Sequence, residues 1–354
     1  MSDPVLIATG SYSRSGRGRG TGIRLLRLRP GAEGLEVQEG ASVELEDPSF
    51  VLWNPEGTLL YAVLETSPTR VVALSVDASG DRAEILADLE LEGSGGCHLA
   101  HGREPGTLLV ADYGSGAVET VRLDESGLPT AQIDLDDHQD RAEHDEAPHP
   151  HQVVALPGTE LLAVPDLGLD RVFLYRQDVT GQIGLAGEIT LGRGSGPRHL
   201  VADHESDQVH VSCERSGMIA TASRRGTETD PSAPVALRGA GYRWGVTSMT
   251  PASRRDVPNA LSHLELTADE SALLVANRGP DTISLLSLAA MRPQILAETP
   301  VGEHPRHFTQ LGDLVLVAAQ EADRIDVLRR GEGSLEVAGE PIPAPSVACL
   351  AVRP

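Results

Sequence analysis

Arginine, histidine and carboxylate side chains recur along this 354-residue chain at the borders of short apolar runs. A histidine or arginine opens several of these runs, and a carboxylate or arginine closes several of the runs that follow. Arginine beside a carboxylate and an imidazole can hold an anionic substrate, and it shifts the pKa values of the groups that move protons. The chemistry that these residue types could perform is therefore acid–base catalysis on a small anion.

The same residues belong to one sequence phrase that returns along the chain. Each copy has a polar opening residue, a short strand, a turn and a second apolar strand that ends in a polar residue. The copies are PSFVLWNPEGTLLYAVLE (48–65), CHLAHGREPGTLLVADYGSG (97–116), PHQVVALPGTELLAVPDLGLD (150–170), PRHLVADHESDQVHVSCERSG (197–217), SHLELTADESALLVANRGPD (262–281), PRHFTQLGDLVLVAAQEAD (305–323) and the truncated PSVACLAV (345–352). The openers Ser49 and Ser346 lie 297 residues apart over six intervals of 49.5 residues, close to the roughly 40–50 residues of a four-stranded propeller blade.

The last copy stops after its first strand, and the missing strands are available at the other end of the chain. Apolar runs at 5–12, 22–28 and 35–41 have the composition of strands. If they complete the last blade, the ring closes and no sheet edge stays open between the first and last blades. The sequence therefore predicts an all-β fold, a seven-bladed β-propeller with four-stranded antiparallel blades, as a single domain over 1–354.

The repeat also predicts boundaries. Residues 4–42, approximately, would complete the blade begun by 345–352. Two insertions interrupt the period: an acidic, His-containing segment near 134–149 and an Arg-, Pro- and Gly-rich segment near 224–259. We expect the second insertion to be an extended excursion with its own hairpin.

Hairpin geometry predicts where the chemistry-bearing residues gather. The start of a first strand and the end of a second strand lie on the same edge of an antiparallel pair, and the first strand of each blade lines the central channel. We therefore expect all openers and second-strand ends to converge at one mouth of that channel. The openers are Ser49, His98, His151, Arg198 with His199, Ser262 with His263, Arg306 with His307, and Ser346, and the second-strand ends are Glu65, Tyr113, Asp166, Glu214, Arg278 and Gln320. The alternative is that these groups form ion pairs between blades and cap strands.

Composition excludes several classes of partner. The chain has 52 acidic and 29 basic residues, for a net charge of −23, so its field repels nucleic acid and anionic membranes. Every basic side chain is arginine, which removes a P-loop lysine and Schiff-base chemistry from consideration. The three cysteines, Cys97, Cys213 and Cys349, have no CxxC spacing and are expected as buried free thiols. Because no apolar stretch reaches the roughly 18 residues of a spanning helix, we expect a cytoplasmic protein.

Competing motifs are weak. GRGRGTG (16–22) follows a strand but opens no helix, so a flexible hairpin loop is the better interpretation than a phosphate cradle. His149 and His151 in EHDEAPHPH could suggest zinc, yet no third ligand is nearby in sequence. We therefore predict no metal and no other cofactor.

The motifs and their order resemble the seven-bladed β-propeller lactonases, which include bacterial 6-phosphogluconolactonases and fungal carboxymuconate-cyclising enzymes. The resemblance covers essentially the whole chain and rests on GSY (10–12), PSF (48–50) with LYAVLE (60–65), ADYGSG (111–116), HPH (149–151) before PDLGLD (165–170), GPRH (196–199), CE (213–214), ANR (276–278) and PRHF (305–308). The chain departs from the family where asparagines are usual, with Leu64, Asp112 and Cys213.

The resemblance implies catalytic roles for His151, Arg198, Glu214 and Arg278, the strongest members of the predicted ring. Glu214 or His151 would be the general base for a water that attacks a lactone carbonyl. Arg278 and Arg198 would bind the oxyanion and the anionic groups of the substrate, with Arg306 and His199 assisting. Further candidates for substrate contacts are His149, Asp166, Glu65 and Tyr113.

The expected function is hydrolysis of a sugar-acid lactone, by resemblance 6-phosphogluconolactone to 6-phosphogluconate. Two alternatives stay open: a lactonising cyclase or isomerase of the carboxymuconate type, and a non-catalytic propeller that binds a partner. The expected partner is a small anionic lactone or carboxylate, with no nucleic acid and no membrane. The expected assembly is a monomer or a weak homo-oligomer.

Overall fold

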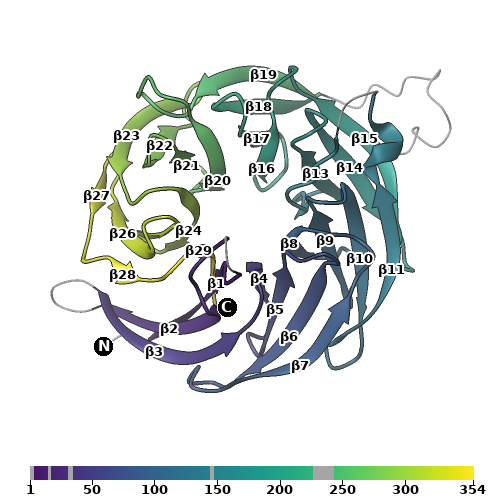
Figure 1. The fold of residues 1–354 in the computed structure, drawn as a ribbon. Coiled ribbons are helices and arrows are strands. Elements are labelled where there is room, and N and C mark those ends of the chain that lie inside the picture. Colours follow the sequence, from purple (N-terminus) through teal and green to yellow (C-terminus); the bar gives the residue numbers. More distant parts are fainter. Residues whose placement is uncertain (1–3, 15–16, 31–34, 144–146, 226–242) are drawn as a thin grey trace.

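Seven antiparallel sheets surround a central axis like the blades of a propeller (Figure 1). The computed structural model describes residues 4–14, 17–30, 35–143, 147–225 and 243–354. Within these ranges each blade has four strands, and one blade has a short fifth strand. The predicted fold class is confirmed.

Six blades follow one another along the chain, each from its inner strand outward. The first blade consists of β4 (Pro48–Trp53), β5 (Leu59–Leu64), β6 (Arg70–Val76) and β7 (Ala83–Glu90), and the second of β8 (Gly96–His101), β9 (Thr107–Asp112), β10 (Ala117–Leu123) and β11 (Pro129–Asp137), followed by the 3-10 helix η1 (His138–Arg141). The third consists of β12 (Val154–Ala155), β13 (Leu161–Asp166), β14 (Arg171–Gln177) and β15 (Ile183–Thr190), and the fourth of β16 (Pro197–Ala202), β17 (Gln208–Cys213), β18 (Met218–Arg225) and β19 (Arg243–Pro251). The fifth consists of β20 (Ala260–Leu266), β21 (Ala272–Arg278), β22 (Thr282–Ser287) and β23 (Gln294–Pro300), and the sixth of β24 (Pro305–Leu311), β25 (Leu314–Ala319), β26 (Arg324–Arg330) and β27 (Leu335–Val337), with β28 (Ile342–Pro343) also paired with β26.

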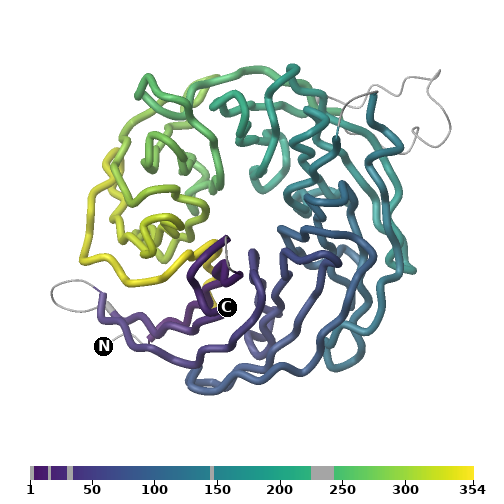
Figure 2. The backbone as a smooth tube through the Cα atoms, in the orientation of Figure 1, coloured from purple at the N-terminus to yellow at the C-terminus, as the bar shows by residue number. Residues whose placement is uncertain are grey.

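The seventh blade joins the two ends of the chain. Its order is β29 (Val347–Val352), β1 (Val5–Ser11), β2 (Gly22–Pro30) and β3 (Leu35–Glu44), so the C-terminal strand is innermost and the N-terminal strands complete the sheet. The tube trace shows both ends meeting in this blade (Figure 2). The indole of Trp53 in the next blade donates to the carbonyl of Ala351 at 3.1 Å.

Burial follows strand position within each blade. Every residue of β5 is buried because both faces of this strand are covered, so the strand is a continuous apolar run. The outer strand β7 is largely exposed. Seven apolar clusters lie between successive blades around the ring, and each draws residues from two neighbours. Burial between blades therefore holds the ring together, and the channel itself is free to carry polar side chains.

Both expected insertions contain strand residues that the sequence reading assigned to loops. Residues 134–137 are the end of β11, where Ala117 pairs with Asp137. Likewise β19 pairs with β18 from Met218 with Pro251 to Arg225 with Arg243, so it is the outer strand of its blade. Polar outer strands look like loops in sequence because one face meets water. Residues 226–242 of the expected excursion lie outside the described residues.

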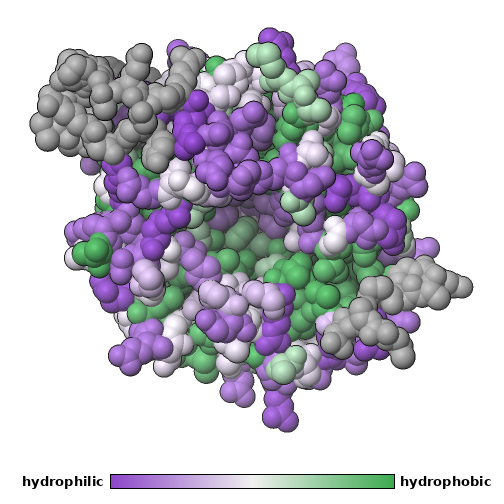
Figure 3. Space-filling model, turned by 180° about the vertical axis from the view of Figure 1, so that it is seen from behind, coloured by the Kyte–Doolittle hydropathy of each residue, from purple (hydrophilic) through white to green (hydrophobic). Residues whose placement is uncertain are grey.

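From behind, the molecule is hollowed at its centre, with hydrophilic side chains over much of the margin (Figure 3). Among the described residues, no helix has the length and apolarity needed to span a bilayer.

Candidate functional site

A cavity of about 340 Å³ lies at the end of the channel where the inner strands begin and the second strands end. All seven blades contribute to its wall. The lining residues are Tyr12, Arg17, Glu65, Cys97, Tyr113, His151, Glu214, Arg278, Arg306 and Gln320. The predicted convergence of distant chain segments at one mouth is therefore present in the structure.

One set of lining side chains comes from the residue that follows the second strand of a blade. In these blades its backbone N–H donates to a carbonyl just before the inner strand, which fixes the direction of its side chain. The pairs are Tyr12 with Ser346 (3.1 Å), Glu65 with Asp47 (2.9 Å), Tyr113 with Gly95 (3.1 Å), Glu214 with Gly196 (2.7 Å) and Gln320 with His304 (3.1 Å). In the remaining contributing blade the lining residue is Arg278, the last residue of β21, which pairs with Ala260.

A second set comes from a bulge at the start of the inner strands. The register shifts between Gly96 and His98, between Pro197 and His199, and between Pro305 and His307. The skipped residues are Cys97, Arg198 and Arg306. A β-bulge re-aims the side chain of its extra residue. Here Cys97 and Arg306 line the cavity, and Arg198 contacts Glu214 of its wall.

The residue after each of these bulges packs in the channel with Phe50 of β4 and His263 of β20. His98, His199, His263, His307 and Phe50 pack there ring against ring, with centroids 4.1 to 5.8 Å apart. We call these five rings the channel plug. Burial, together with neighbouring histidine and arginine charges, lowers the pKa of all four histidines, to about 3 for His263. The plug is therefore uncharged, and it contacts the cavity wall through His199, whose ring lies 5.4 Å from that of His151.

Glu214 stands between two arginines. Its Oε2 lies 2.5 Å from Nη2 of Arg278 and 3.1 Å from Nε of Arg198, and the two arginine side chains are 9% and 3% exposed. Burial alone would raise the pKa of Glu214, but Arg278 and Arg198 outweigh it and hold the pKa below its usual value. Burial and the charges of Arg278 and Arg306 lower the pKa of Arg198 to about 9. Nη1 of Arg198 is buried with no hydrogen-bond partner among the described residues.

Glu65 anchors the opposite wall. Its carboxylate accepts the hydroxyl of Tyr12 at 2.6 Å and pairs with Arg17. The guanidinium groups of Arg17 and Arg306 lie 5.0 and 5.2 Å from the centre of the Tyr12 ring. Tyr12 thereby positions Glu65 and supports both cations.

The balance of charge makes the cavity an anion site. Four arginines, Arg17, Arg198, Arg278 and Arg306, face two carboxylates, Glu65 and Glu214. These six groups carry a net charge of +2, inside a chain with a net charge of −23. An anion is therefore attracted locally although the protein as a whole repels it.

His151 is a neutral imidazole in this cationic surrounding. Burial, followed by the charges of Arg198, Arg306 and Arg278, holds the pKa of His151 well below its usual value. Its Nδ1 lies 3.7 Å from Sγ of Cys97. Its Nε2 has no hydrogen-bond partner among the described residues, and the side chain lines the cavity. The imidazole can therefore accept a proton from a bound molecule.

Three predicted substrate contacts lie elsewhere. Asp166 is fully buried, and its carboxylate binds Nδ1 of His138 at 2.7 Å and the backbone N–H of His149 at 2.9 Å. It sits one residue before the lining position, which Leu167 occupies, and adjacent strand residues point to opposite faces. His199 belongs to the channel plug rather than to the cavity wall.

His149 also stands behind the wall. Its ring stacks on Tyr113 with centroids 4.3 Å apart, and its Nδ1–H donates to the carbonyl of Tyr113 at 2.8 Å. His149 therefore orients a lining residue instead of lining the cavity itself. Both histidines of the HPH motif contact the ring of Tyr113. Their Nδ1 atoms have different neighbours, because that of His149 donates to the carbonyl of Tyr113 and that of His151 lies beside Sγ of Cys97.

Sequence reasoning missed three lining residues. Tyr12 follows β1, the second strand of the closing blade, so the rule used for the other second-strand ends would have found it. Cys97 was read only as a buried thiol, because the bulge that puts it in the place expected for His98 leaves no mark in the sequence. Arg17 lies in the glycine-rich loop interpreted as a flexible hairpin, and no repeat equivalent signals it.

Comparison with known proteins places this architecture among lactonases. The family described as lactonase, 7-bladed beta-propeller, matches residues 6–352. A 6-phosphogluconolactonase of Bacillus subtilis (strain 168) is 25% identical over 305 residues, which are 84% of this chain and 83% of the relative. The periplasmic gluconolactonase of Pseudomonas aeruginosa superposes with a TM-score of 0.85 at 22% identity, over 99% of both chains. A protein of Lactobacillus plantarum superposes with a TM-score of 0.86 at 21% identity, again over 99% of both chains. At these identities the two structures establish a common fold.

Proposed function

The chain belongs to the seven-bladed β-propeller lactonase family, and from this premise we propose that it hydrolyses 6-phosphogluconolactone to 6-phosphogluconate. The relative from Bacillus subtilis carries that activity in its name. The observation that carries the proposal is a neutral His151 in the same cavity as Arg278 and Arg306. Its Nε2 has no hydrogen-bond partner among the described residues, and Arg198 pairs with Glu214 in the wall of this cavity.

His151 is the proposed general base. A water molecule between Nε2 and the lactone carbonyl gives its proton to the imidazole as its oxygen attacks the carbonyl carbon. The arginines that lower the pKa of His151 keep it free of protons before the reaction. As the carbonyl oxygen becomes negative it offsets these same charges, so the affinity of His151 for the proton rises during the attack.

Arg198, Arg278 and Arg306 are the proposed partners of the oxyanion. Preorganised donors in a site that excludes water stabilise developing charge with little reorganisation. When the tetrahedral intermediate collapses, the bond to the ring oxygen breaks and the protonated His151 returns its proton to that oxygen. The product is the open hydroxy acid, and atoms and charge balance with one water consumed.

Glu214 is the proposed positioning residue for the arginines. Its two ion pairs lower its pKa, which makes it a weaker base, while its carboxylate holds Arg198 and Arg278 at fixed places. We therefore assign the proton transfer to His151 and the ordering of the cations to Glu214.

The test is acid release in a pH-stat, corrected for spontaneous lactone hydrolysis. His151→Asn should lower kcat about a hundredfold or more on 6-phosphogluconolactone. His204→Asn is the matched control, because His204 is exposed and lies outside the cavity. Unaltered turnover in His151→Asn would dismiss the assignment of the base.

The substrate panel separates the alternatives. Purified protein is offered 6-phosphogluconolactone, gluconolactone and a carboxymuconate. Turnover of the carboxymuconate alone would replace the proposal with lactone formation or isomerisation. No turnover of any compound by correctly folded protein would leave a binding propeller instead.

A further inference from the structure

A second depression of about 760 Å³ adjoins the cavity between the blade of β16–β19 and the blade of β20–β23, which are neighbours in the ring (Figure 1). Glu214 and Arg278 line both spaces. The rest of its wall comes from the turn after β17, the loop that leads from β19 to β20, and His304 before β24. We call this depression the outer groove.

Two arginines of the outer groove lack a carboxylate partner. Among the described residues, no carboxylate oxygen lies within 4 Å of the guanidinium of Arg215 or of Arg255. Nη1 of Arg255 donates to the carbonyl of Pro280 at 2.9 Å, which fixes one side of this guanidinium and leaves its other donors free. Glu298 is near enough to feel the charge of Arg255, but its oxygens already accept from Ser253 and from the backbone of Arg254.

His304 completes the polar wall beside Arg278. Its Nε2 lies 3.5 Å from Nη1 of Arg278, and burial together with the nearby arginines lowers its pKa to about 4. A neutral imidazole adds a hydrogen-bonding group without adding charge. The groove therefore presents two exposed cations, Arg215 and Arg255, and an uncharged donor or acceptor.

The arginines of the cavity and those of the outer groove differ in their exposure to water. Arg198 and Arg278 are nearly buried, which suits charge that appears only during the reaction. Arg215 and Arg255 are exposed, so an anion beside them keeps part of its hydration, and the free-energy cost of its desolvation is small. A permanent dianion is easier to place in the outer groove, where Glu214 is the one carboxylate of the described wall, than in the cavity, where Glu214 and Glu65 both stand.

We propose that the outer groove is the subsite for the phosphoryl group of a phosphorylated sugar lactone, held by Arg255 and Arg215. This inference rests on the proposed function. The carbonyl and the phosphoryl group lie at opposite ends of such a lactone, and the shared residues Glu214 and Arg278 connect the two spaces that would receive them. The planar fork of arginine matches phosphate oxygens with paired donors.

The test compares 6-phosphogluconolactone with gluconolactone. In Arg255→Ala and in Arg215→Ala, the ratio of kcat/KM for the phosphorylated lactone to that for the unphosphorylated lactone should fall at least about tenfold, the effect of losing one charge-assisted contact. Arg255→Lys should retain part of the ratio, since it keeps the charge but loses the fork. Inorganic phosphate should inhibit the wild type competitively, and more weakly in Arg255→Ala.

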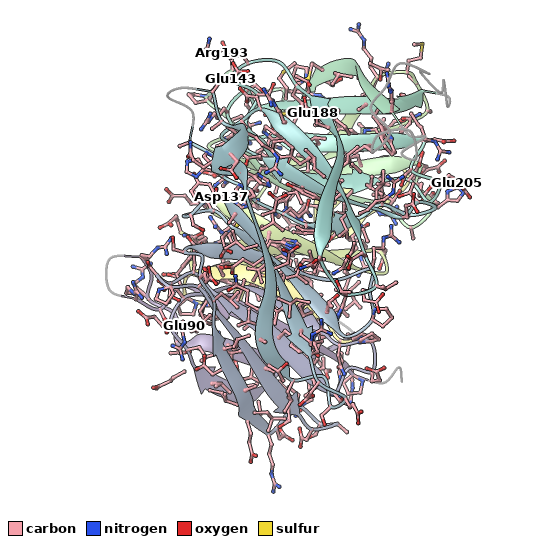
Figure 4. All side chains as sticks on the ribbon, turned by 90° about the vertical axis from the view of Figure 1, so that its right-hand side faces the viewer. Glu90, Asp137, Glu143, Glu188, Arg193 and Glu205 are labelled. Atoms are coloured by element: carbon pink, nitrogen blue, oxygen red, sulfur yellow. The ribbon has the colours of Figure 1, made fainter. Side chains whose placement is uncertain are left out.

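The matched control is Arg193→Ala. Arg193 is an exposed arginine on the loop between β15 and β16, the equivalent connection one blade earlier, and it lies at the periphery of the molecule (Figure 4). In Arg193→Ala, the ratio of kcat/KM for the phosphorylated lactone to that for the unphosphorylated lactone should equal the ratio of the wild type. Unchanged ratios in both groove variants, or a wild type with no preference for the phosphorylated lactone, overturn the subsite and leave lactone hydrolysis standing. A folded wild type that hydrolyses neither lactone overturns both proposals.

Discussion

Replacing Glu214 with Gln removes the carboxylate that pairs with both Arg198 and Arg278. The two arginine side chains are 3% and 9% exposed, so the variant leaves two buried cations without this counter-ion. Breaking a buried pair from one side costs 3–5 kcal/mol as a rule. Because Glu214 itself is 26% exposed, water screens part of the interaction, and we expect a loss near the lower limit, about 3 kcal/mol.

The assay is urea unfolding of the wild type, Glu214→Gln, Arg278→Met and the double variant. The double variant should lose at least about 1 kcal/mol less than the two single losses together, because it removes the pair instead of stranding one partner. Phosphate should stabilise Glu214→Gln more than the wild type, since it replaces the missing negative charge.

Activity decides between the two candidate bases. Glu214→Gln should lower kcat about tenfold to a hundredfold by loosening the arginines, and His151→Asn should lower it further. A Glu214→Gln variant with wild-type stability and with a larger loss of kcat than His151→Asn would refute this reasoning and make Glu214 the base.

Two further predictions concern pH. The kcat/KM of the wild type should persist as the pH falls below about 6.5, the usual pKa of a histidine, because the pKa of His151 is held well below that value, and it should fall only where the imidazole takes up its proton. In Arg306→Met the acid limb should move to higher pH, since one of the charges that lower the pKa of His151 is gone; a limb that does not move would contradict this. Asp112 and Glu119 are buried carboxyl groups whose pKa values are raised by burial, by the charge of Glu119 on Asp112 and by that of Glu92 on Glu119. The folded protein thus retains a proton that the unfolded chain releases, so the contribution of this pair to stability should be greatest below the usual carboxyl pKa of about 4 and should decline as pH rises through the raised values. Asp112→Asn should flatten this decline in thermal melts at pH values above about 4, and an unchanged slope would show that the pair holds no extra proton.

The fold was predictable because each blade repeats one pattern. Apolar second strands are buried on both faces and leave a plain signal, as in β5. The closing blade was predictable because the last copy lacked the strands that the N-terminus supplies. The outer strands β11 and β19 were harder, since half of each strand meets water and resembles a loop.

The candidate site was predictable to within one residue. Glu65, Tyr113, Glu214 and Arg278 occupy lining positions because the end of a second strand is easy to find in the sequence. Asp166 does not line the cavity, because successive side chains of a strand point to opposite faces. A shift of one position therefore moves a side chain from the cavity to the interior.

Bulges and loops account for the rest. The bulge before His98 and His199 carries Cys97 and Arg198 to the cavity end and sends the histidines into the channel plug, and sequence patterns do not show such an extra residue. Arg17 was hidden because it belongs to no repeat. The monomeric or weakly oligomeric state and the cytoplasmic location stay predictions.

Because of the closing blade, the cavity wall can be completed only after the last strand of the chain has been synthesised. Tyr12 and Arg17 are made first, but they reach the wall only when β1 has a neighbour on its inner side, and that neighbour is β29. A nascent chain released from the ribosome short of Val347 would possess the other six blades and yet an unfinished wall. The ability to bind a ligand should therefore appear late and in a single step, when β29 pairs with β1.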